Sequence, residues 1–353
     1  MRFNWLSLRV TAAAALAVLA ASSAGYAQQV PFGRLPVSRF DVTPPSARVT
    51  GSPGSIAVRQ TTCRAQPATA TRRRIVDVAV QEWAYFGFPV IDRTRLEATE
   101  QDDDPTTRPR RRPRLPAEEA ERLASSIAGY WTATPSAGWV LARQNEEWKG
   151  PDGISARWQY PWSAAFISWV MCEGGLGDAG QFQRAAAHHV YIDQAIRARG
   201  ARDPRAAFTA YDIGDAVVEP GDLLCSARRP AYRNLAARQQ RMGEGARTHC
   251  DVVVHVDGRT EQVLAIGGNV GGRVSLKMLQ GQRVENTLRP KAISLGRRGM
   301  SAFVHLKLRA PSIASAAMDG TPTLQSLSCL RGTRPPQLAV LGLDLQRSSA
   351  CTE

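Results

Sequence analysis

The chain has 353 residues, is 43% hydrophobic, and carries a formal net charge of +14 from 41 arginines and 4 lysines against 31 acidic residues. Such a charge first suggests a nucleic-acid partner, but the basic residues are dispersed rather than gathered in one stripe, which argues against that class. An apolar run from Val10 to Ala21 follows two arginines and leads through small residues to Ala27. This pattern is typical of a secretory signal peptide, residues 1–27, cleaved after Ala27.

An exported protein with this charge is expected to meet an anionic polymer of the cell envelope, such as peptidoglycan, rather than nucleic acid. No later stretch approaches the ~20 apolar residues of a spanning helix. The sequence therefore predicts no stable membrane insertion and a periplasmic or extracellular location. All six cysteines follow the signal, where an oxidising compartment permits disulfides. No C-x-x-C or paired Cys/His spacing occurs, so no metal and no cofactor is predicted, and no pattern indicates the oligomeric state.

Helical periodicity begins after an arm, residues 28–71, which is rich in Pro, Ser, Thr and Gly and is predicted to be mostly irregular. Apolar residues at three- and four-residue steps then predict a helix over 72–86. Residues 101–116 hold three aspartates followed by arginines between prolines, which predicts an exposed loop. Further helices are predicted over 116–127, 139–148 and 182–199.

From Val217 onward the apolar period changes to two, which predicts strands. Helices followed by antiparallel strands are typical of an α+β domain, here assigned to residues 72–308. The tail, residues 309–353, is predicted to be loosely ordered, with Cys329 and Cys351 as its candidate tie. The predicted strands are 223–225, 248–256, 262–266, 273–278 and 303–308. The predicted core includes Trp83, Phe166, Val170, Leu224, Val252, Val254 and Ile266.

The segment Trp158–Met171 reads W-Q-Y-P-W-S-A-A-F-I-S-W-V-M and is apolar almost all round after Ser163. Such a run predicts a helix that is buried on every side, with Ser163 at its start. Two interpretations of Ser163 follow from this segment. It is a helix cap, because serine is among the best N-cap residues, or it is a nucleophile held at the positive end of a buried helix.

Four motifs occur in order: P-W-S-A-A-F-I-S-W at Pro161, E-P-G-D-L-L at Glu219, H-C-D-V-V-V at His249 and I-G-G-N-V-G-G-R-V at Ile266. Together they resemble the CHAP and NlpC-type amidases and peptidases, papain-like enzymes that cut peptidoglycan. With its A-H-x-x-Y-I segment at Ala187, the chain is similar to an uncharacterised bacterial branch, a domain of unknown function. The resemblance implies a papain-like α+β fold in which a central N-terminal helix packs on an antiparallel sheet.

The resemblance implies a catalytic triad of Ser163, His249 and Asn269, with serine in place of the cysteine of these enzymes. A hydroxyl does not ionise as a thiol does, so His249 would have to remove its proton during attack. Asn269, after the next strand, would orient the imidazole. His249 and Asp251 share one face of the predicted strand. His255 lies about 20 Å farther along, at 3.3 Å per residue, so only one of these histidines can reach the helix start.

Two functions stay open: a serine hydrolase or transferase of the amidase or peptidase type, and a non-catalytic relative that binds peptidoglycan or polysaccharide in its groove. A third hypothesis moves the nucleophile to Cys250 or Cys172, although Cys250 faces away from His249 and Cys172 lies farther along the helix. Cys225 and Cys250 are predicted to form a disulfide, because their strands are predicted to be adjacent. The candidate substrate-binding residues are Trp158, Tyr160, Trp162 and His188, with at least one of the three aromatic residues expected in the core.

Overall fold

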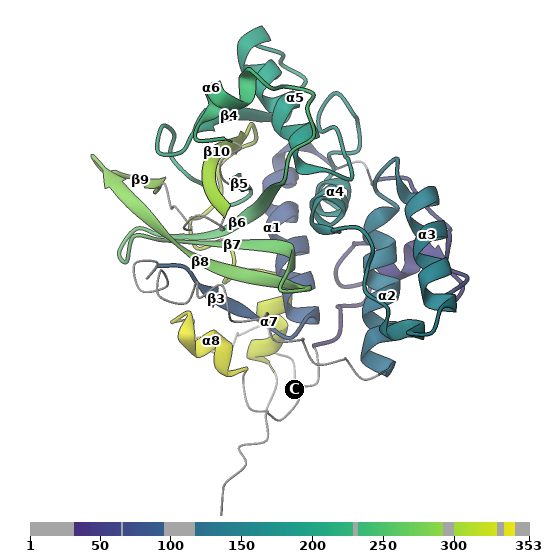
Figure 1. The fold of residues 1–353 in the computed structure, drawn as a ribbon. Coiled ribbons are helices and arrows are strands. Elements are labelled where there is room, and N and C mark those ends of the chain that lie inside the picture. Colours follow the sequence, from purple (N-terminus) through teal and green to yellow (C-terminus); the bar gives the residue numbers. More distant parts are fainter. Residues whose placement is uncertain are drawn as a thin grey trace, which may run out of the picture. The chain divides into compact units, whose positions relative to one another are not determined.

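The computed structural model describes residues 32–64, 66–94, 117–228, 232–291, 300–329 and 335–342. The predicted signal peptide, the predicted loop 101–116 and Cys351 lie outside these ranges. The described residues form an eight-stranded sheet with helices packed against it (Figure 1). In spatial order the strands are β3 (Val90–Asp92), β8 (Arg273–Val284), β7 (Gln262–Val270), β6 (Thr248–Asp257), β5 (Leu223–Arg228), β10 (Met300–Leu308) and β4 (Phe208–Asp212), with β9 (Thr287–Pro290) paired to β8.

The α+β class and the five predicted strands are confirmed, as β5, β6, β7, β8 and β10. The prediction of a wholly antiparallel sheet is wrong, because β3 runs parallel to β8, with Val90 opposite Leu276. No hairpin joins these two strands, so chain connection does not impose an antiparallel pairing on them. The strands β3, β4 and β9 were not predicted; they have three to five residues, too few for a period of two to stand out.

The predicted helices are present, and one begins later than expected. The predicted helix over 182–199 is observed only from His188, because Ala187 is extended at φ −136° and ψ 134°. Figure 1 shows α1 and α4 close to the sheet and α2 and α3 farther from it. The helices are α1 (Ala68–Tyr85), α2 (Ala117–Trp131), α3 (Ala137–Lys149), α4 (Ser163–Glu173), α5 (His188–Ala201), α6 (Leu235–Gln239), α7 (Pro322–Ser328) and α8 (Pro336–Val340).

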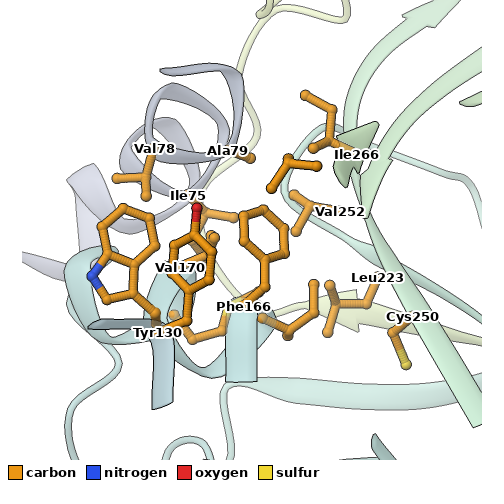
Figure 2. Close-up of a cluster of buried hydrophobic side chains, with 14 of the residues drawn as sticks. Ile75, Val78, Ala79, Tyr130, Phe166, Val170, Leu223, Cys250, Val252 and Ile266 are labelled. Carbon is orange, nitrogen blue, oxygen red and sulfur yellow. The ribbon is translucent and has the colours of Figure 1, made fainter. Parts of the chain in front are cut away.

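Helix α4 is the central helix, and all eleven of its residues are buried, as its apolar sequence predicted. It packs against α1, α2, β6 and β7. Figure 2 shows the contact, where Phe166 and Val170 of α4 meet Tyr130 of α2 and Val252 of the sheet. Burying a side chain of this size contributes about 1.5–3 kcal/mol to the stability of the domain. All seven residues predicted for the core are buried, with Leu224 in a second cluster.

The arm before α1 is integrated into the domain, although it holds little regular structure. Its elements are a 3₁₀ turn (Pro45–Arg48) and the short pair β1 (Val49–Thr50) and β2 (Ala57–Val58). Arg48 is fully buried and donates to Glu173 at the end of α4 across 2.8 Å. Cys63 forms a disulfide with Cys172 of α4. The arm therefore closes over one end of the central helix.

The described part of the tail also packs, whereas the sequence predicted loose order from residue 309. Met318 and Leu324 are fully buried, and α7 lies against α1. Helix α7 has only seven residues, too few for a helical period to stand out in the sequence. Among the helices of the described ranges, none is long and apolar enough to cross a membrane.

Candidate functional site

Ser163 is the first residue of α4, as predicted, and its hydroxyl does not act as a helix cap. Trp162 occupies the N-cap position, and Ser163 Oγ instead lies 2.7 Å from Nε2 of His188. Ser163 is 8% exposed, so its hydroxyl sits just beneath the surface at the positive end of a buried helix. The cap hypothesis is therefore wrong, because the side chain is committed to a partner from another helix.

The segment between α4 and α5, residues 174–187 (the strap), brings His188 to Ser163. The Ser168 hydroxyl of α4 accepts from the Ala185 N–H and donates to the Ala185 carbonyl, both at 3.0 Å, which ties the strap to α4. Nδ1 of His188 accepts from the backbone N–H of Cys250 at 3.2 Å and is also paired with the Tyr191 hydroxyl. Both ring nitrogens are thus occupied by protein groups, and the ring is only 3% exposed. His188 is not placed to bind substrate directly.

The protonation of His188 follows from its surroundings. Burial lowers the pKa of this imidazole well below 6.5, and the neighbouring His249 lowers it further. Asp251 acts in the opposite direction without reversing the result. His188 is therefore neutral near pH 7.

His249 lies at the start of β6 and is held by a buried carboxylate. Its Nε2 is 2.8 Å from Oδ1 of Asp251, and Oδ2 of Asp251 accepts from Nζ of Lys277 on β8, also at 2.8 Å. Burial by itself would raise the pKa of Asp251, but the charges and hydrogen bonds of His249 and Lys277 outweigh it and hold that pKa well below its usual range. Asp251 is consequently an anion that accepts the Nε2–H of His249.

Because Asp251 holds Nε2 of His249, Nδ1 is the ring nitrogen that this carboxylate does not engage. Among the described residues, no group forms a hydrogen bond with that atom. The rings of His188 and His249 are 5.3 Å apart between centroids, so Ser163, His188 and His249 form one cluster. A serine, a histidine and a carboxylate can carry out nucleophilic chemistry when the hydroxyl and the histidine come within hydrogen-bond reach of each other.

Two glycines of β7 make room for this cluster. A Cβ at Gly267 would lie 1.9 Å from Oδ1 of Asp251 and 2.8 Å from Nε2 of His249. A Cβ at Gly268, on the opposite face, would lie 2.5 Å from Cβ of Phe166 in α4. The Gly-Gly pair therefore lets β7 pass between the His249–Asp251 pair and the central helix.

Asp251, rather than Asn269, is the residue hydrogen-bonded to His249. Asn269 ends β7 with a left-handed φ of 58°, and within the described part of the chain its side chain has no hydrogen-bond partner. Asp251 is two residues after His249 on the same strand face, so the signal for it was already in the alternation of β6. Lys277 had no such signal, because only the register of β8 against β7 brings it near Asp251.

The three aromatic candidates before Ser163 have different environments. Trp162 is 2% exposed and stacks on the rings of Phe86 and Tyr130, which confirms that at least one of the three is a core residue. Trp158 is half-buried in an edge contact with Trp148. Tyr160 is half-buried and contacts Trp139 of α3.

Tyr160 meets Trp139 of α3, edge to face, with ring centroids 4.8 Å apart. Trp139 is 54% exposed. The two rings, with Arg143 and Glu146, line an open depression of about 400 Å³. Of the aromatic candidates, Tyr160 is thus the one placed at a surface hollow.

The disulfides settle the roles of the cysteines near the site. Cys225 and Cys250 are bonded, with Cα atoms 4.1 Å apart, as predicted. Cys63–Cys172 was not predicted. The hypothesis of a cysteine nucleophile at Cys250 or Cys172 is therefore wrong. Cys329 is also disulfide-bonded, while its predicted partner lies outside the described residues. In the described ranges no group of three or more His, Cys, Asp or Glu side chains could hold a metal ion.

The fold and the cluster define an α+β protein whose central helix begins at a serine that contacts one histidine and adjoins a second, carboxylate-bound one. The family model for an uncharacterized protein conserved in bacteria (DUF2272) matches residues 119–307, more than half of the chain, and the chain belongs to this family. The match spans the whole Ser163, His188, His249 and Asp251 cluster. Comparison with curated proteins and with solved structures finds no match.

Proposed function

We propose that the protein is an exported hydrolase of the amidase or peptidase type that acts on peptidoglycan or a related anionic polymer of the cell envelope. The observation that carries the proposal is the position of His249. Its Nε2 is held by the Asp251 carboxylate, and its ring adjoins that of His188, the partner of Ser163, so Nδ1 is the nitrogen left to serve as the base. The proposed triad is Ser163 as nucleophile, His249 as base and Asp251 as orienting group.

The chemistry would proceed in two halves. Ser163 Oγ attacks the carbonyl carbon of an amide while its proton passes to Nδ1 of His249, and Asp251 stabilises the imidazolium that forms. The C–N bond then breaks, and His249 returns that proton to the leaving amine. Water attacks the resulting ester with His249 again as base, which releases the acid and restores Ser163. The dipole of α4 favours negative charge at its N-terminus, where the oxyanion develops.

The substrate class rests on three supports of different kinds. The motifs resemble the CHAP and NlpC-type cell-wall amidases, although the papain-like relation remains part of the proposal. The net charge of +14 suits an anionic polymer. The signal-like N-terminus and the disulfides are compatible with an exported protein. Periplasmic or extracellular action is proposed accordingly.

A second function is favoured by a specific observation: the site offers little surface. Ser163 and His249 are only 8% and 9% exposed, and the Ser163 oxygen already has a protein partner. A relative that has lost catalysis and binds polymer along its groove would tolerate this closure. In that case Tyr160 and the depression beside Trp139 would carry the binding.

Digestion of purified peptidoglycan distinguishes the two functions. The wild-type protein and Ser163→Ala are incubated with peptidoglycan, and the soluble fragments are mapped by mass spectrometry. The hydrolase predicts fragments with one new amine and one new carboxyl end from the wild type and none from Ser163→Ala. Ser55→Ala, an exposed serine outside the cluster, serves as the matched control and should behave as wild type.

Labelling by a fluorophosphonate probe gives an independent readout of Ser163. Covalent labelling of the wild type and its absence in Ser163→Ala would support the nucleophile. Retained sedimentation with peptidoglycan in both proteins, without labelling or fragments, would instead establish the binding function. Ser163→Cys restores the thiol of the enzymes that the motifs resemble and is expected to keep or raise turnover.

A further inference from the structure

We propose that His188 is a positioning residue: its Nδ1 accepts hydrogen bonds from the protein and its Nε2–H donates to Ser163 Oγ, so that His188 fixes this hydroxyl and does not act as its base. The inference deepens the proposed function and rests on it for the chemistry of Ser163. The tautomer itself rests only on hydrogen bonds within the protein.

The argument starts at Nδ1 of His188, because one of its partners has a fixed role. The backbone N–H of Cys250, 3.2 Å away, can only donate. Nδ1 must therefore present its lone pair and carry no hydrogen. The Tyr191 hydroxyl, the other partner of Nδ1, agrees with this role. Burial raises the pKa of Tyr191 well above 10, and the nearby Asp251 raises it further, so the phenol keeps a proton to donate.

The second step concerns Nε2. A neutral imidazole carries one N–H, and with Nδ1 unprotonated that hydrogen must be on Nε2. Nε2 lies 2.7 Å from Ser163 Oγ, so it donates and the serine oxygen accepts. An Nε2 that bears a hydrogen has no lone pair with which to take the serine proton. His188 therefore cannot be the base for Ser163, although it is the histidine in contact with it.

Charged and titratable groups around His188 favour the neutral ring. His189 on its own helix, His249 on β6 and Lys277 on β8 all disfavour a positive charge there, and only Asp251 on β6 favours one. Adding a proton at Nδ1 would also place two N–H groups, its own and that of Cys250, against each other. Both effects keep His188 neutral across the range in which an ordinary histidine titrates.

The hydrogen bond from His188 limits the directions in which the Ser163 hydroxyl proton can point. With one oxygen lone pair occupied by His188, rotation of the hydroxyl is restricted and its proton cannot point at Nε2 of His188. In the proposed triad the acceptor is therefore His249, whose Nε2 is held by Asp251 and whose Nδ1 is not. The two histidines thus have opposite roles: His188 is a fixed donor and His249 is the acceptor.

The tautomer is measured by long-range ¹H–¹⁵N correlation spectra of the imidazole nitrogens in ¹⁵N-labelled protein. The chain has five histidines, and the His188 signals are assigned by their loss in His188→Gln. We expect the Nε2–H tautomer from pH 5 to pH 8 without titration, and a shift of the Nε2 signal in Ser163→Ala. An Nδ1–H tautomer, or protonation within that range, would overturn the inference.

Reactivity variants test the positioning role. In His188→Gln the amide can still donate to Ser163 and accept from Cys250, whereas His188→Leu can do neither. Fluorophosphonate labelling should stay within about tenfold of wild type in His188→Gln and fall by about 100-fold in His188→Leu, the loss expected from a misplaced reacting group. His249→Gln should lose about 100-fold or more, the contribution of a general base.

The order of fluorophosphonate labelling in His188→Gln and His249→Gln decides which histidine is the base. If His188→Gln abolishes labelling and His249→Gln retains it, His188 is the base and the inference is wrong. Thermal melting of each variant identifies any that fails to fold, and His188→Gln is the variant designed to keep the local hydrogen bonds. If the wild type is not labelled at all, the proposed hydrolase is refuted, while the tautomer measurement still decides the role of His188.

Discussion

The substitution Gly267→Ala should break the hydrogen bond between His249 and Asp251. The added Cβ would lie 1.9 Å from Oδ1 of Asp251, and that oxygen must move by about 1.5 Å to reach 3.4 Å, the near limit of ordinary contact. A movement of this size cannot preserve the 2.8 Å bonds from Asp251 to His249 and to Lys277. Gly267 is buried in a strand and does not have a positive φ, so the backbone itself accepts alanine.

The magnitude follows from the two effects that this contact combines. Inserting a methyl group into a packed site costs about 1–3 kcal/mol, and weakening hydrogen bonds to a buried carboxylate costs about 1.5–3 kcal/mol each when fully lost. Because the protein can relax partly, we expect the free energy of unfolding to fall by about 2–4 kcal/mol. Fluorophosphonate labelling of Ser163 should fall with it, since His249 loses the group that orients it.

Chemical denaturation and the ¹⁵N spectrum of His249 measure the two effects separately. Gly258→Ala is the matched control, because no atom lies within 4 Å of its Cβ, and it should change stability by less than about 0.5 kcal/mol. Gly268→Ala, which strikes Phe166, should destabilise the protein while keeping the Nε2–H signal of His249. An unchanged unfolding free energy together with an unchanged His249 spectrum in Gly267→Ala would refute the packing argument.

Three further predictions concern acid stability, the arm and a disulfide. The pKa of His188 is lowered in the folded protein, so below about pH 6.5 the unfolded chain binds one proton more than the folded one. The unfolding free energy should therefore decline as pH falls from 7.5, by at most about 1.4 kcal/mol per pH unit. Denaturation curves of His188→Gln should show a flatter decline. Arg48→Met leaves Glu173 buried without its partner and should cost about 3–5 kcal/mol, whereas Arg48→Met with Glu173→Leu should recover most of that loss in the same assay. Replacing Cys63 and Cys172 by alanine opens a link across 109 residues and should lower the unfolding free energy by about 5 kcal/mol; a loss below about 1 kcal/mol would show that the arm holds without its covalent tie.

Features set by local pattern were predictable from the sequence. Helix α4 was identifiable because an apolar run of that length leaves no polar face for water, and β6 because its side chains alternate. The disulfide Cys225–Cys250 followed from two strands separated by one excursion, so that adjacency was the simplest pairing. Ser163 at the start of α4 was likewise a local property, since it stands where Pro161 and Trp162 give way to the apolar run.

The partners within the site were decided by tertiary structure alone. Ser163 and His188 are 25 residues apart and meet only because the strap at Ala185 is fixed by Ser168, a contact with no sequence period. Lys277 reaches Asp251 through the register of three strands, and a shift of one residue would turn it to the opposite face. A sequence motif names which residue types are present, whereas the hydrogen bond each one makes depends on where the chain brings a second element. For that reason the sequence singled out Ser163 and His249, and only the fold showed that the hydrogen-bond partner of Ser163 is His188 and that of His249 is Asp251.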